Sequence, residues 1–123
     1  SAALAKLSEL LRYVVYETEM EKISIQKEID IISQYIDIEK IRLSNPDSVS
    51  FCSSVSKDIQ VPPMIFLPFI ENGFKHSNLT NKGQKLDISI SENNNNLLFH
   101  CINTVIGKKE DNSDRGIGIK LVR

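Results

Sequence analysis

The spacing of apolar residues predicts two helices at the start of the chain. Apolar side chains recur at three- and four-residue steps over residues 2–19 and again over residues 26–43, as one buried face of a helix requires. The repeats are formed by Leu4, Leu7, Leu11 and Val14 and by Ile25, Ile29, Ile32 and Ile36. Ser24 is a candidate N-cap for the second helix, and Asn45-Pro46-Asp47 ends it with turn residues. We expect the two helices to form an antiparallel hairpin or part of a dimer bundle.

The pattern changes after residue 46. Alternating apolar residues between 49 and 55 give a weak strand signal. Val61-Pro62-Pro63 favours extended backbone, because proline disfavours helix in the residue before it. Pro63 suits a helix entry, so a third helix is expected over residues 64–77.

The second half of the chain predicts a hairpin, a loop and a last helix. Apolar residues alternate over residues 84–91 and 97–103, and the asparagines at 93–96 form the tight turn between these strands. Residues 104–115 are polar and aperiodic, which indicates a mobile loop. Gly116-Ile117-Gly118 then opens a final helix. The expected fold is an α+β two-layer sandwich in the α/β class, with the third helix packed on a mixed sheet.

Composition limits the class of protein. The chain has 123 residues and a net charge of -1, which gives no electrostatic case for nucleic acid or an anionic membrane. No apolar run approaches the length that spans a bilayer, and no signal peptide opens the chain. Cys52 and Cys101 match no metal-binding spacing and no disulfide framework, so both are expected to be small buried residues in a reducing cytoplasm.

The third helix collects polar groups on one side. At about 100° per residue, its polar residues fall within an arc of roughly 140°, with apolar residues and Ser77 opposite. The polar arc holds Pro68, Glu71, Asn72, Lys75 and His76. An amide oxygen suits Mg²⁺ and an ammonium suits phosphate, although such an arc on an amphipathic helix is usually only solvated. Gly116 and Gly118 add a second weak signal, because glycines at a helix start let backbone N–H groups approach phosphates.

The order of these features resembles the GHKL family of ATP-binding domains. Val61-Pro62-Pro63-Met64 followed by Pro68-Phe69-Ile70-Glu71-Asn72-Gly73-Phe74-Lys75-His76 is similar to a segment of LytS-type sensor histidine kinases. Leu7-Ser8-Glu9-Leu10-Leu11-Arg12-Tyr13 and Tyr35-Ile36-Asp37-Ile38-Glu39-Lys40-Ile41-Arg42 resemble the region that follows the phosphoacceptor in these kinases. The resemblance implies a helical hairpin over residues 1–46 and a GHKL ATP-binding domain over residues 47–123, incomplete at its end.

The resemblance also implies a role for each matching residue. Asn72 would bind Mg²⁺, Lys75 would contact phosphate and His76 would border the nucleotide. Glu71 would be a catalytic residue or a plain surface carboxylate. Gly116 and Gly118 would lie near the phosphates, and residues 104–115 would form the ATP lid.

Two departures from the family pattern affect this interpretation. The family has an aspartate that accepts a hydrogen bond from adenine, followed by two glycines at alternate positions. Continuing the alternation of Leu97, Phe99 and Cys101 puts Asn103 at the aspartate position. Val105 and Gly107 then stand at the two glycine positions. Asparagine oxygen still accepts this bond without the charge. The phosphoacceptor histidine is also absent, because His76 belongs to the nucleotide face and His100 is expected on the sheet surface.

The function that follows is ATP-dependent phosphorylation of a histidine upstream of this chain, with onward transfer to a response regulator. ATP and Mg²⁺ are the implied cofactors. The implied protein is a homodimer with its catalytic part in the cytoplasm, and with membrane contact only through segments before residue 1. One alternative is a GHKL ATPase, which needs a glutamate where Pro68 stands. The other is a degenerate module that binds partners and little nucleotide.

Overall fold

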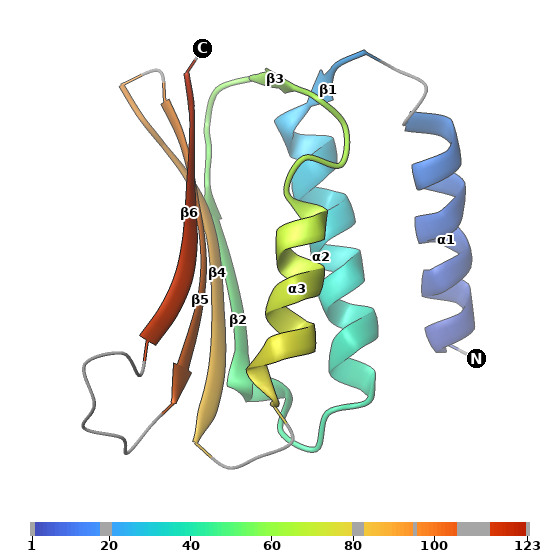
Figure 1. Cartoon of the computed structure of the whole chain (residues 1–123). Helices are drawn as coiled ribbons and strands as arrows, with labels where there is room; N and C mark the ends of the chain where they lie inside the picture. The colour runs from blue at the N-terminus through green and yellow to red at the C-terminus, as the bar shows by residue number, and fades with distance from the viewer. Residues whose placement is uncertain (1, 18–20, 80–82, 95, 106–113, 123) are drawn as a thin grey trace.

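The computed structural model describes residues 2–17, 21–79, 83–94, 96–105 and 114–122. It begins with two antiparallel helices, α1 (Ala2–Glu17) and α2 (Ile25–Ile41), as expected (Figure 1). The Ser24 side chain caps α2 by accepting a hydrogen bond from the Gln26 N–H at 3.2 Å. An ion pair between Lys6 and Asp37 at 3.2 Å joins the helices. Because both of its side chains are well exposed, this pair contributes little stability.

Four strands form the main sheet in the order β2, β4, β5, β6. They are β2 (Val49–Ser54), β4 (Gln84–Asn93), β5 (Asn96–Val105) and β6 (Asp114–Val122). β2 is parallel to β4, and the other two pairs are antiparallel. The predicted hairpin is confirmed, with Asn93 opposite Asn96 at its turn. A two-stranded pairing of β1 (Ile23–Ser24) with β3 (Gln60–Val61) ties the start of α2 to the segment before the third helix.

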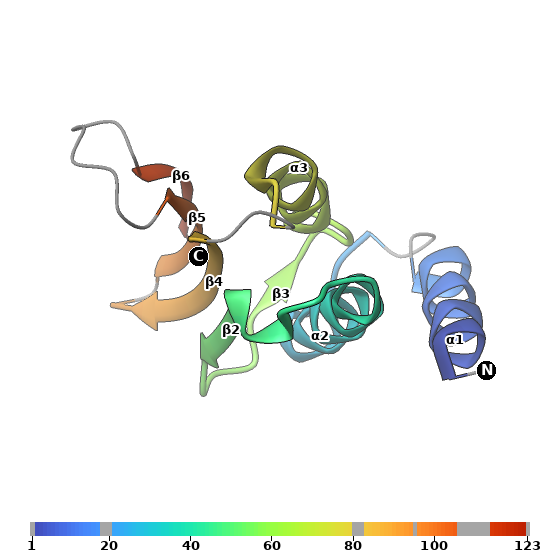
Figure 2. The same ribbon diagram turned by 90° about the horizontal axis from the view of Figure 1, so that it is seen from below.

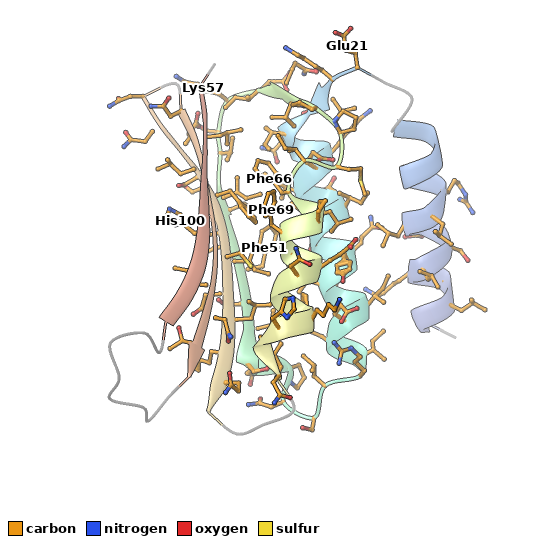
Figure 3. All side chains as sticks on the ribbon, in the orientation of Figure 1. Glu21, Phe51, Lys57, Phe66, Phe69 and His100 are labelled. Carbon is orange, nitrogen blue, oxygen red and sulfur yellow. The ribbon has the colours of Figure 1, made fainter. Side chains whose placement is uncertain are left out.

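The helices α2 and α3 (Leu67–Ser77) lie on one face of this sheet (Figure 2). Buried isoleucines of α2 share one hydrophobic core with Phe66, Ile70 and Phe99. The Phe66 and Phe99 rings stack at 4.9 Å, and Phe66, Phe69 and Phe51 point between the layers while His100 lies on the other face (Figure 3). The α+β two-layer sandwich is therefore confirmed. The core runs across residue 46, and the domain boundary there stays a prediction.

The third helix begins at Leu67, so the expected start at Met64 is wrong. A helix starting at Met64 would place Pro68 four residues inside it. Proline has no N–H for the Met64 carbonyl, and its ring clashes with that carbonyl. Met64 instead takes a left-handed conformation with φ 63°, and Pro68 falls in the first turn, where the missing N–H has no consequence.

The last predicted helix is also wrong, because residues 114–122 form strand β6. Ile117, Ile119 and Leu121 alternate along this segment and pair with Cys101, Phe99 and Leu97 of β5. This period of two suits a strand that extends the sheet. The expected loop is accordingly shorter, since Thr104, Val105, Asp114 and Arg115 belong to strands. Its remaining residues, 106–113, lie outside the described part of the chain.

Candidate functional site

Gly73 brings the middle of α3 close to the sheet. A Cβ at this position would lie 2.8 Å from Cys101 Sγ and 3.2 Å from Leu86 Cδ1. Cys101 and Leu86 belong to β5 and β4 and are buried. Because Gly73 has no side chain, α3 can lie close to these two strands. The distance between α3 and the sheet in turn determines how far the neighbouring residue, Asn72, lies from the sheet.

The neighbours of Gly73 point to opposite flanks of α3. The Phe74 ring packs edge-on against Tyr35 of α2, with ring centroids 5.8 Å apart. Successive helix residues are about 100° apart, so Asn72 lies on the flank of α3 that faces away from α2. His76, four residues later, lies on the same flank, and both side chains are exposed. We call this pair the polar flank of α3.

Glu71 and Lys75 lie elsewhere on the helix surface. Both are exposed. Burial raises the pKa of Tyr35 first, and the charges of Glu39 and Glu71 raise it further, which indicates that Glu71 lies on the α2 side of α3. Lys75 falls between Glu71 and the polar flank and points away from the sheet. The four residues share the predicted arc, and by helix geometry Asn72 and His76 lie nearest in angle to Gly73, which packs on the sheet.

Asn103 supplies a buried acceptor without a partner. It follows the helix-facing residues Leu97, Phe99 and Cys101 at alternate positions of β5, and it pairs with Leu86 on β4. Within the described residues, its Oδ1 atom is buried and accepts no hydrogen bond. A buried carbonyl oxygen without a donor is destabilising, so a ligand that donates a hydrogen bond here would satisfy it. The adenine amino group has this chemistry.

The predicted glycine positions give a mixed result. Gly107 lies outside the described residues. Gly116 and Gly118 are in β6, opposite Ile102 and His100, so the helix start that would have directed N–H groups at phosphates is not formed. Asn103 pairs with Arg115, which places Gly116 beside the position opposite Asn103. A role for these glycines in phosphate binding stays a prediction.

The predicted site residues did not include Gly73, although the sequence holds its signal. An isolated glycine inside a helical pattern lowers helix stability and commonly marks a close packing contact. Gly73 stands between Asn72 and Phe74, and the contact it permits reaches Cys101 on the strand that also carries Asn103. Of the two cysteines expected to be small buried residues, Cys101 is buried, whereas Cys52 is exposed, so the expectation for Cys52 is wrong.

The described residues contain no group of three or more His, Cys, Asp or Glu side chains able to hold a metal. Mg²⁺ in nucleotide sites is commonly held by one or two side chains together with substrate phosphates, and the exposed amide of Asn72 fits such a ligand. None of the described helices is both long and apolar enough to span a membrane.

Two comparisons with known proteins agree. Residues 1–46 match the family model "Histidine kinase". The chain is also 22% identical over 132 aligned positions to "Sensor protein LytS" of Streptococcus mutans, and this match covers 98% of the chain. The chain spans only 23% of that relative's length. Both matches are to histidine kinases, and the second supports a similarity to LytS-type kinases over nearly the whole chain.

Proposed function

We propose that this chain carries the ATP-binding part of a sensor histidine kinase, together with helices that connect it to the phosphoacceptor. The observation that carries the proposal is the partnerless Oδ1 of Asn103, on the sheet face against which α3 packs. This arrangement supports an adenine-accepting position beside a helix that offers an amide and an imidazole. The similarity to LytS over 98% of the chain supports the same function.

In this proposal, the Asn103 oxygen accepts a hydrogen bond from the adenine amino group. The Asn72 oxygen binds Mg²⁺, the Lys75 ammonium approaches the phosphates, and His76 borders the nucleotide. Mg²⁺, when bound, supplies positive charge against the charge that develops on the phosphate oxygens. The contribution of the chain's own residues is to hold the γ-phosphate in line with its acceptor. Both alternatives for Glu71, catalytic residue or surface carboxylate, stay open.

The reaction transfers the γ-phosphoryl group from ATP to a ring nitrogen of a histidine upstream of residue 1, and ADP leaves. The phosphoryl group then passes to an aspartate on a response regulator. We further propose that the complete protein is a homodimeric membrane sensor with this part in the cytoplasm. In it, α1 and α2 connect the sensor to the ATP-binding part.

Autophosphorylation of the complete protein tests this function. With labelled ATP, wild type should label its upstream histidine, and Asn72→Ala should not, while far-UV circular dichroism of the two proteins stays the same. The matched control is Asp30→Ala, which removes an exposed acidic side chain of α2, outside the polar flank of α3. A wild-type protein that binds no ATP would replace the kinase proposal with the degenerate module. Equal labelling of Asn72→Ala would refute the metal role of Asn72.

A further inference from the structure

Glu28 is a buried acid that the proposed reaction does not use. It lies in the first turn of α2 and is 1% exposed. Its Oε1 atom accepts a hydrogen bond from the Ile65 N–H at 3.3 Å. Its Oε2 atom is buried and has no partner among the described residues. Desolvation raises the pKa of Glu28, while the backbones of Met64 and Ile65 act in the opposite direction. Burying such a group is costly, which suggests a task beyond packing.

The backbone that Glu28 holds is the strained turn before α3. Met64 has φ 63°, a left-handed conformation that is strained for a non-glycine residue. The N-cap residue of α3, Phe66, makes no side-chain cap. The start of α3 is therefore fixed from outside, by a carboxylate on a neighbouring helix that accepts from the turn.

This contact connects α2 to the polar flank. Asn72 is five residues after Leu67, the first residue of α3, which is about 7.5 Å along the helix at 1.5 Å per residue. A helix transmits a shift at its start along its length, so a change in how α2 holds the turn would move Asn72 relative to Asn103. The close packing of Gly73 on Cys101 leaves little room for such a movement to be absorbed.

We propose that Glu28 is a positioning residue for nucleotide binding, which acts by fixing the turn at Met64 and Ile65 and thereby the placement of Asn72 on α3. The proposal rests on the proposed function and adds a route from α2, within the region matching the histidine kinase family, to the nucleotide. An apolar side chain of the same size would fill the space but leave the Ile65 N–H without an acceptor.

The test compares three substitutions at Glu28 with Asp30→Ala as the control. Glu28→Gln keeps an oxygen acceptor at the same reach, Glu28→Asp keeps the charge but shortens the reach, and Glu28→Leu removes the acceptor. Amide hydrogen exchange by NMR reports the bond at Ile65, the Asn72 amide shift reports the helix position, and titration with MgATP reports affinity. The amide of Ile88, in the buried middle of β4, reports the integrity of the core.

Glu28→Leu should speed exchange at Ile65 and weaken MgATP binding by about tenfold each, the size expected when a buried N–H loses its acceptor. Glu28→Gln and Asp30→Ala should both keep the wild-type exchange rate at Ile65 and the wild-type affinity for MgATP. If Glu28→Leu also loses exchange protection at Ile88, its core is disturbed and Glu28→Asp becomes the test of the proposal. In Glu28→Asp we expect a changed chemical shift of the Asn72 amide and weaker MgATP binding.

Two outcomes would overturn the proposal. One is unchanged Ile65 exchange in Glu28→Leu, and the other is MgATP affinity in Glu28→Asp equal to that of Asp30→Ala. A wild-type chain that binds no MgATP would refute the proposed function instead. In that case the chemical shift of the Asn72 amide still tests the link from α2 to α3. A changed shift in Glu28→Asp supports this link, and an unchanged shift refutes it.

Discussion

Replacing Gly73 with alanine tests the contact that sets α3 on the sheet. The new Cβ would lie 2.8 Å from Cys101 Sγ, closer than real Cβ contacts. Overpacking of a core costs about 1–3 kcal/mol, and alanine in place of glycine inside a helix returns about 1 kcal/mol. We therefore expect Gly73→Ala to lower the free energy of unfolding by about 1 kcal/mol, measured by urea unfolding followed by far-UV circular dichroism.

A double-mutant cycle separates the clash from other effects. Cys101→Ala removes the sulfur atom and should cost about 1 kcal/mol by itself. In that background the clash with Sγ is gone, so Gly73→Ala should be neutral or stabilising by up to about 1 kcal/mol. The coupling between the two sites should be about 1–2 kcal/mol. Asn72→Ala, on the exposed neighbour, is the control and should stay within about 0.5 kcal/mol of wild type. A coupling of zero would refute the reasoning.

Three further predictions follow from single side chains. Ser24→Ala removes the hydroxyl that caps α2 and should lower stability by about 1 kcal/mol in urea unfolding; no loss would mean that the cap is not formed in solution. A thiol reagent at mildly alkaline pH should label the exposed Cys52 and spare Cys101, since burial raises the pKa of the Cys101 thiol to about 11; equal labelling of the native protein would contradict this. Burial raises the pKa of Glu28 above the ordinary value of 4.5, so the folded chain binds this proton more tightly than the unfolded chain does. The free energy of unfolding should therefore fall as pH rises from about 4.5 through the raised pKa. Glu28→Gln should flatten this part of the urea-stability profile, and an unchanged slope would show that another group causes it.

Periodicity predicted the elements whose pattern local spacing determines. The helices over residues 2–17 and 25–41 and the hairpin through Asn93–Asn96 follow directly from their apolar repeats. The last segment has an equally clear strand signal in Ile117, Ile119 and Leu121, but Gly116 and Gly118 favour the start of a helix on local pattern alone. In the structure, pairing with β5 decides its conformation.

The remaining differences depend on contacts between distant residues. The start of α3 is set by Pro68 and by a carboxylate 37 residues before Ile65, which no local pattern reveals. The sequence predicts the polar arc of α3, but it does not show which residues of the arc lie toward the sheet and which lie away from it. Which residues border the sheet depends on Phe74 packing against Tyr35 of α2 and on Gly73 meeting Cys101.

The central claim is that this chain binds MgATP through Asn72, and calorimetric titration with MgATP tests it most directly. We expect wild type to bind, and Asn72→Ala to bind at least about tenfold more weakly, the effect of losing about 1.4 kcal/mol of metal-dependent contact. The urea midpoints of the two proteins should agree, because Asn72 is exposed. Equal affinities for MgATP in the two proteins would contradict the account.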